Sequence, residues 1–147
     1  MRVRACAVVQ RQDCILTLVY NYPNGVVHAL PGGTMDDGES LVDCLVREFQ
    51  EELGITIQPG RLRLVGDMMP VGQLKQTVHL VFDAELISGE PTLNPAETSA
   101  AACAWLPMDS LAAVNLYPAV NQALLVDRAA GGADPRYVGN CLAREWA

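Results

Sequence analysis

The sequence predicts an α/β domain in which helices pack on a central mixed β-sheet. Segments rich in branched apolar residues, typical of strands, stand on both sides of one strongly amphipathic segment, Leu41–Leu53. A second helical pattern follows near the end of the chain, over residues 117–128. Elements arranged in this order bury their apolar faces against one another as an α/β sandwich.

The length and composition predict one globular domain over residues 1–147, in which residues 129–147 carry no assignable motif. Half of the residues are hydrophobic (50%) and 18% are charged, as is usual for soluble proteins. No apolar run approaches the ~20 residues of a membrane span, and the N-terminus lacks the apolar core of a signal peptide. We therefore expect a cytoplasmic protein that does not associate with membranes.

The net charge of −7 at pH 7 argues against a general nucleic-acid binder, which would present a basic face. It does not argue against an anionic small molecule, because metal ions held by the protein's own carboxylates can meet phosphate groups. Acidity and phosphate chemistry are thus compatible if cations mediate.

The first elements are a predicted hairpin, residues 3–10 and 14–20, and a short strand over residues 26–30 that ends at Pro31-Gly32-Gly33. The helix Leu41–Leu53 has a plausible N-cap in Ser40 and a C-cap glycine in Gly54. Beyond it, branched residues predict strands over residues 55–57, 61–65, 76–87 and 102–106. A short helix over residues 109–114 and the long helix over residues 117–128 complete the pattern.

The cysteines and histidines are expected to be structural. The five cysteines are scattered, odd in number and without C-x-x-C spacing, so reduced and mostly buried thiols are favoured over disulfides or a zinc site. His28 and His79 both lie in strand-like segments, where packed side chains are favoured over ligands.

Three glutamates of the central helix carry the chemistry. Glu48, Glu51 and Glu52 lie at i, i+3 and i+4 and therefore share one helical face. Such like charges repel, and a hard cation such as Mg²⁺ or Mn²⁺ would remove the repulsion. Gly32 and Gly33 would let backbone carbonyls approach the same ion. On spacing alone, a metal site and a solvated acidic face are equally good interpretations.

The segment from Gly33 resembles a complete Nudix box. The family pattern is glycine, five residues, glutamate, seven residues and then R-E-U-x-E-E-x-G-U, where U is a bulky apolar residue. Gly33, Glu39 and residues 47–55 fill every specified position at the right spacing. The lead-in Leu30-Pro31-Gly32 is also similar, and residues 105–111 resemble a late strand and short helix of Nudix domains.

This resemblance implies an α/β/α sandwich with a central mixed β-sheet and a metal-dependent hydrolase of diphosphate linkages. Glu51 and Glu52 would bind Mg²⁺ or Mn²⁺ together with a backbone carbonyl of the Gly32–Gly33 turn. Glu48 would be a further metal ligand or the base that deprotonates water, and Glu52 is the other preferred candidate for that base. Arg47 would orient the carboxylates, and Glu39 would support the helix from the loop. Glu97 is a later candidate for the base, but it is equally well explained as a surface residue.

The resemblance leaves the substrate open. Pro70, sixteen residues after Gly54, is similar to a pattern of ADP-ribose pyrophosphatases, which favours ADP-ribose or a nucleotide sugar slightly. The alternatives are a house-cleaning hydrolase of (oxidised) nucleoside triphosphates and a non-catalytic nucleotide-binding module. Tyr20 and Tyr22 would either stack on a base or pack within their loop. The expected partner is a small-molecule nucleotide, and a homodimer is allowed.

Overall fold

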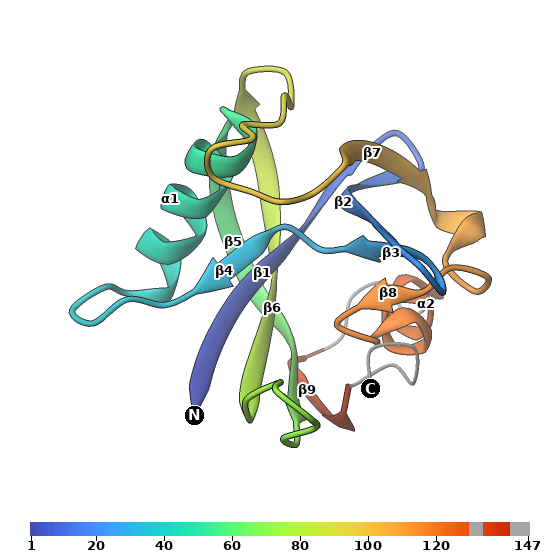
Figure 1. Cartoon of the computed structure of the whole chain (residues 1–147). Helices are drawn as coiled ribbons and strands as arrows, with labels where there is room; N and C mark the ends of the chain where they lie inside the picture. Colours follow the sequence, from blue (N-terminus) through green and yellow to red (C-terminus); the bar gives the residue numbers. More distant parts are fainter. Residues whose placement is uncertain (130–133, 142–147) are drawn as a thin grey trace.

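The structure is a computed structural model that describes residues 1–129 and 134–141 (Figure 1). Its first half holds four strands and the long helix: β1 (Arg2–Arg11), β2 (Cys14–Tyr22), β3 (Gly25–Ala29), β4 (Gly32–Thr34) and α1 (Leu41–Leu53). Its second half holds β5 (Thr56–Met68), β6 (Thr77–Ser88), β7 (Ala102–Pro107), the 3₁₀ turn η1 (Met108–Ser110), β8 (Leu116–Tyr117), α2 (Asn121–Ala129) and β9 (Arg136–Asn140).

The strands form one mixed sheet in the order β8-β3-β2-β1-β6-β5-β9, with β4 added to β1 and β7 added to β2. The pairs β1–β6, β3–β8 and β5–β9 are parallel, whereas the other pairs are antiparallel. Figure 1 shows the sheet opening into two halves that share β1, with α1 against one half and α2 beside the other. The predicted α/β/α sandwich around a mixed sheet is confirmed.

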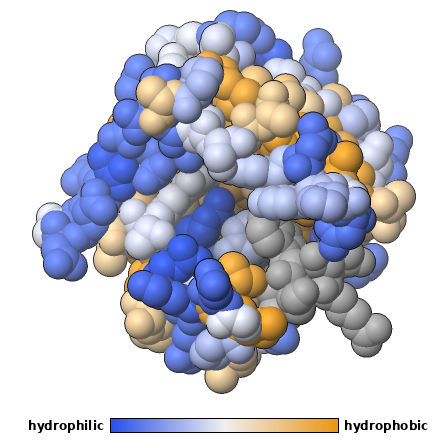
Figure 2. Space-filling view, viewed as in Figure 1, coloured by the Kyte–Doolittle hydropathy of each residue, from blue (hydrophilic) through white to orange (hydrophobic). Residues whose placement is uncertain are grey.

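Two buried clusters stabilise the halves of the molecule. One surrounds the apolar face of α1, where Cys44, Leu45, Phe49 and Leu53 are fully buried. The other joins β1 and β6 to η1, β8 and α2. The opposite face of α1 is hydrophilic, and the surface is hollowed beside it (Figure 2). The helix is thus fixed to the sheet by its apolar stripe and presents its acidic residues outward.

The second half of the chain departs from the sequence prediction at two helices. The helix predicted from residue 117 begins only at Asn121, because Leu116–Tyr117 pairs with β3 as a strand. Pro118 follows, and a residue that precedes proline is biased toward extended backbone. The helix predicted over residues 109–114 is only the 3₁₀ turn Met108–Ser110.

Three strands also differ from the prediction. Segments 55–57 and 61–65 form the single strand β5, because Pro59 sits at a shift in register against β6, where a proline is tolerated. The predicted loop at residues 32–34 is the short strand β4, paired with β1. In the unassigned tail, β9 pairs with β5. Residues 130–133 and 142–147 of that tail lie outside the described residues.

The side-chain predictions for the cysteines and histidines hold. All five cysteines are free thiols, and three of them are buried. His79 is fully buried, while His28 is half-buried and its Nδ1 lies 3.0 Å from the Thr17 hydroxyl. In the described part of the chain, no helix is both long and apolar enough to cross a membrane.

The packing of α1 gives a first prediction. Phe49→Ala should lower the free energy of unfolding by about 3–5 kcal/mol, because it removes a fully buried aromatic ring and leaves a cavity. Val42→Ala is the matched control on the same helix, since Val42 is exposed, and it should change this free energy by less than about 0.5 kcal/mol. Urea unfolding measures both, and equal effects would contradict the packing described.

Candidate functional site

Helix α1 is held at both ends by its caps. The Ser40 hydroxyl accepts a hydrogen bond from the Asp43 N–H at 3.0 Å, as an N-cap does. Gly54 adopts a left-handed conformation (φ 65°) and donates its N–H to the Gln50 carbonyl. Only glycine adopts this conformation without strain, so the helix ends immediately after its glutamates. The predicted helix bounds and both caps are confirmed.

Arg47, in the middle of α1, is the centre of an ion-pair network. Its guanidinium binds Glu39 through both nitrogens Nε and Nη2, at 2.7 and 3.0 Å. Its Nη1 donates to Glu48 at 2.9 Å and to Glu51 at 3.2 Å. Asp36 also lies within ion-pair distance. One cation therefore ties the loop before α1 to two glutamates of the helical face.

The ion pairs and the burial around Arg47 shift the pKa values of the neighbouring side chains. The hydrogen bonds from Arg47 lower the pKa of Glu39 to about 2, so Glu39 is a carboxylate at neutral pH. Burial raises the pKa of Glu48, although Arg47 opposes the shift. Burial also raises the pKa of Cys44 to about 12, which makes this thiol an inert core residue. Within this network, Glu39 and Arg47 thus form a charged pair, while burial makes ionisation of Glu48 less favourable.

Gly33 lies directly against the carboxyl group of Glu48. A Cβ built on Gly33 would collide with the Cδ and both oxygens of that carboxyl group. Any larger residue would therefore displace Glu48. The box glycine is required at this position because the backbone of β4 and a carboxylate of α1 share the same small space.

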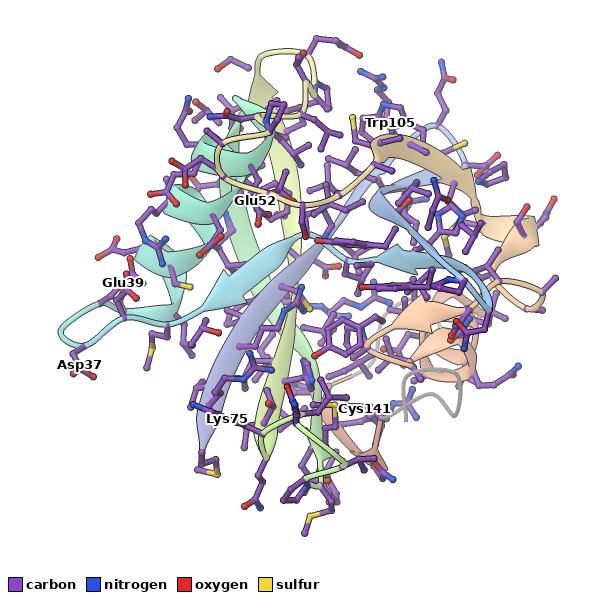
Figure 3. The ribbon with its side chains drawn as sticks, viewed as in Figure 1. Asp37, Glu39, Glu52, Lys75, Trp105 and Cys141 are labelled. Carbon is purple, nitrogen blue, oxygen red and sulfur yellow. The ribbon has the colours of Figure 1, made fainter. Side chains whose placement is uncertain are left out.

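Glu52 differs from the other two glutamates of the face because Arg47 does not reach it. Its Oε2 atom is buried and has no hydrogen-bond partner among the described residues. Burial, followed by repulsion from Glu48, raises its pKa to about 7. A buried carboxylate oxygen without a partner is costly unless a proton or a cation satisfies it. Figure 3 shows Glu39 and Glu52 toward opposite ends of α1.

The loop between β6 and β7 brings Glu97 to the same region. The N–H groups of Thr92 and Asn94 donate to the carbonyls of Leu53 and Glu52, at 3.0 and 2.9 Å, which ties this loop to the last turn of α1. Glu97 follows in the turn closed by Asn94, and its charge contributes to the raised pKa of Glu52. Glu97 is therefore near the box.

The predicted site residues are all assembled at one place. Arg47, Glu48, Glu51 and Glu52 lie on α1, Gly33 lies against the Glu48 carboxyl group, Gly32 precedes it on β4, and Glu97 lies near Glu52. Within residues 1–129 and 134–141, no three acidic, histidine or cysteine side chains meet closely enough to enclose an ion by themselves. Pro70 lies apart from the box, exposed in the connection that follows β5.

Arg4 belongs to the site and was not predicted. It lies on β1, and its charge acts on both Glu48 and Glu52. With Tyr20, Tyr22 and Tyr117 it borders a cavity of about 240 Å³ that reaches Gly32 and Gly33. The available signal was the alternation of Arg2 and Arg4 in an apolar strand, which indicates a polar face on β1.

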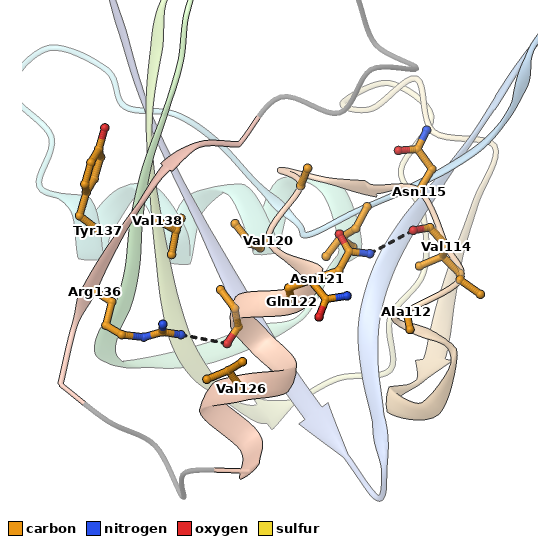
Figure 4. A pocket seen from close by; sticks show the side chains of 14 residues that line it. Ala112, Val114, Asn115, Val120, Asn121, Gln122, Val126, Arg136, Tyr137 and Val138 are labelled. Carbon is orange, nitrogen blue, oxygen red and sulfur yellow. Dashed lines mark hydrogen bonds between the residues drawn. The ribbon is translucent and has the colours of Figure 1, made fainter.

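A second cavity, of about 760 Å³, lies between β8, α2 and β9 (Figure 4). Two of its polar side chains are held by contacts within the protein. Asn121 donates to the carbonyls of Leu111 and Val114, while Arg136 pairs with Asp127. None of the glutamates of the box lines it. The candidate site is therefore the smaller cavity and the adjoining face of α1.

The raised pKa of Glu52 gives a stability prediction for the metal-free protein. The folded protein binds the proton of Glu52 more tightly than the unfolded chain does. This proton therefore stabilises the folded state fully below the ordinary pKa of 4.5, and the stabilisation is lost as the pH rises through about 7. Glu52→Gln imitates the protonated form. In EDTA, the variant should match the wild type near pH 4 and exceed its free energy of unfolding by on the order of 2 kcal/mol at pH 8. Curves that stay parallel across this range would contradict the assignment.

Comparison with known proteins agrees with this arrangement. The human 8-oxo-dGDP phosphatase NUDT18 is 35% identical over 83 residues, which are 56% of this chain and 24% of that protein. The NAD-capped RNA hydrolase NudC of Pseudomonas aeruginosa is 28% identical over 131 residues, or 87% of this chain and 45% of that protein. The chain thus spans less than half the length of either relative.

A solved structure and a family model extend the comparison. The crystal structure of an ADP-ribose pyrophosphatase from Streptococcus suis superposes with a TM-score of 0.71 at 22% identity, covering 92% of this chain and 98% of that one. This likeness bears on the fold. The family model of the NUDIX domain matches residues 1–129, which include the whole box and Glu97. The chain therefore belongs to the Nudix hydrolase family.

Proposed function

We propose that the protein hydrolyses a diphosphate linkage in a nucleoside diphosphate derivative, with Mg²⁺ or Mn²⁺ held by glutamates of the box. The observation that carries this proposal is the buried Oε2 atom of Glu52, which has no hydrogen-bond partner among the described residues, while the charges of Glu48 and Arg4 act on this carboxyl group. A carboxylate in this position is held ready for a cation or a proton. Membership of the Nudix hydrolase family favours the cation.

The donor set fits a small hard cation. Glu48, Glu51 and Glu52 offer carboxylate oxygens, and a backbone carbonyl of Gly32 or Gly33 on β4, which lies against Glu48, would join them. Mg²⁺ is usually held by one or two carboxylates, with waters and substrate phosphates in its other positions, so a complete protein cage is not needed. When bound, the ion would neutralise phosphate oxygens and lower the pKa of bound water.

The side chains of the protein would orient the metal ligands and accept the proton of the attacking water. Arg47 holds Glu48 and Glu51 in place while it neutralises Glu39, so their repulsion does not open the site. Glu48 or Glu52 would accept the proton of the attacking water, because both are half-buried and share the acidic face. Glu97 is the alternative base, supported by its position beside Glu52.

The proposed substrate class is ADP-ribose or a nucleotide sugar, in which a diphosphate joins a nucleoside to a second group. This choice is supported by the likeness to an ADP-ribose pyrophosphatase and by NudC, which is named for an NAD cap that contains a diphosphate linkage. The alternative is an (oxidised) nucleoside triphosphate or diphosphate, supported by the human relative named for 8-oxo-dGDP. A panel of dinucleotides, nucleotide sugars and nucleoside triphosphates, assayed for the released phosphate compound, separates the two.

Glu52→Gln tests the proposed metal site. We expect turnover to fall by about two orders of magnitude or more, because the change removes a ligand charge but little volume, while the circular dichroism spectrum stays unchanged. Glu85→Gln, an exposed glutamate of β6 outside the box, is the matched control and should keep full activity. EDTA should abolish the turnover of the wild type and of Glu85→Gln. Added Mg²⁺ or Mn²⁺ should restore it. Near-normal turnover of Glu52→Gln at saturating metal would contradict the proposal.

Glu97→Gln distinguishes the two candidate bases. If Glu48 or Glu52 accepts the proton, this variant should lose less than about tenfold in turnover and keep the pH–rate profile of the wild type. If Glu97 is the base, the loss should reach the 10²–10⁴-fold range typical of general-base catalysis. Steady-state rates across about pH 5–9 decide between them.

A further inference from the structure

The cavity beside the Gly32–Gly33 turn is built from two kinds of residue. Arg4 contributes a guanidinium, while Tyr20, Tyr22 and Tyr117 contribute aromatic rings. The residues come from strands β1, β2, β4 and β8, which lie apart in sequence and meet where the two halves of the sheet diverge (Figure 1). Figure 2 shows a hollow near the middle of this face with hydrophilic surface at its floor. The cavity adjoins the metal site through the two glycines.

Arg4 is fixed in place yet keeps a donor available. Its Nη2 donates to the Leu30 carbonyl at 2.9 Å, and its guanidinium lies 5.2 Å from the centre of the Tyr117 ring. Its Nη1 is buried and has no hydrogen-bond partner among the described residues. A buried charged donor of this kind calls for an acceptor, and a phosphate oxygen is the acceptor that an arginine matches best.

The tyrosines form an aromatic wall next to this donor. Tyr20 and Tyr22 lie at i and i+2 on β2, so both point to the same side of the strand, and their rings are nearly parallel (13°) with centres 6.2 Å apart. Tyr22 is 40% exposed, so a ligand can reach it. The pKa of Tyr22 is raised by burial and by its neighbours Tyr20 and Tyr117, which places all three rings together.

The cavity's size and chemistry limit what it can take. Its volume of about 240 Å³ is smaller than the ~300–1,000 Å³ typical of pockets that enclose a whole drug-sized ligand. Its described lining contains no Asp, Glu, Asn or Gln side chain. Carboxylates and side-chain amides are the groups that read the edges of cytosine and adenine, whereas stacking on an aromatic ring accepts any base.

We propose that this cavity holds only the nucleoside monophosphate half of the substrate, with the base stacked on Tyr22 and the adjacent phosphate bound by Arg4. The inference rests on the proposed function, because it assigns one half of a diphosphate compound to the cavity and leaves the other half outside it. Recognition of the base then depends on ring area. Purines therefore bind better than uracil.

Calorimetric titration with AMP, GMP, UMP and ribose 5-phosphate in the presence of Mg²⁺ tests this subsite. None of these probes contains a diphosphate linkage, so binding is measured without turnover. Tyr22→Leu should weaken AMP binding about tenfold, as loss of one stacking surface does, and leave ribose 5-phosphate unchanged. Tyr137→Leu, an exposed tyrosine of β9 outside the cavity, is the matched control and should bind AMP like the wild type.

Arg4 needs a different comparison because it is partly buried. Arg4→Met should weaken AMP and ribose 5-phosphate by similar factors of about tenfold or more, since each loses the same phosphate contact. Arg4→Lys keeps the charge and should recover part of both affinities. Thermal unfolding of each variant establishes that it is folded before the titrations are compared.

The outcomes separate this inference from the proposed function. AMP binding that is insensitive to Tyr22→Leu and Arg4→Met overturns the subsite, even if diphosphate compounds are hydrolysed. Equal affinities for AMP and ribose 5-phosphate, or for AMP and UMP, also overturn it. If no diphosphate compound is hydrolysed but the variants behave as expected, the proposed hydrolysis fails and the nucleotide subsite stands.

Discussion

The repulsion among the carboxylates around α1 is the constraint on which the site depends. Arg47 offsets most of it, because one guanidinium binds Glu39 from the loop and Glu48 and Glu51 from the helix. A planar group with several donors can do this, whereas a lysine would offer a single point of charge. What Arg47 does not reach is Glu52, so one carboxylate of the face remains for a ligand from outside the protein.

Strand β1 joins the two parts of the site. It pairs with β4, whose Gly33 lies against Glu48, and it carries Arg4 at the floor of the adjoining cavity. It also pairs with β6 in parallel, which fixes it at the centre of the sheet. The proposed metal site and the aromatic cavity are therefore joined by one central strand, as positioning a substrate across them would require.

Local sequence signals were sufficient to predict the helix α1 and the box. The pairing of strands that lie far apart in the chain could not be predicted from the sequence. The bounds of α1 follow from Ser40, Gly54 and the apolar period, all of which act within a few residues. The helix predicted from residue 117 starts too early because Tyr117 belongs to β8, whose partner β3 lies far away in the chain. Arg4 was missed for the same reason, since its neighbours come from three other strands. The distinction between Glu52 and the two glutamates that Arg47 binds depends on side-chain geometry, which spacing alone does not give.

The central claim is that Glu52 and its neighbours bind a divalent cation, and a Mn²⁺ titration followed by electron paramagnetic resonance tests it most directly. The signal of free Mn²⁺ reports binding without any substrate or turnover. The account predicts that the wild type and Glu85→Gln remove Mn²⁺ from solution with the same affinity, while Glu52→Gln binds it at least about tenfold more weakly. Equal Mn²⁺ affinity for the wild type and Glu52→Gln would contradict the account.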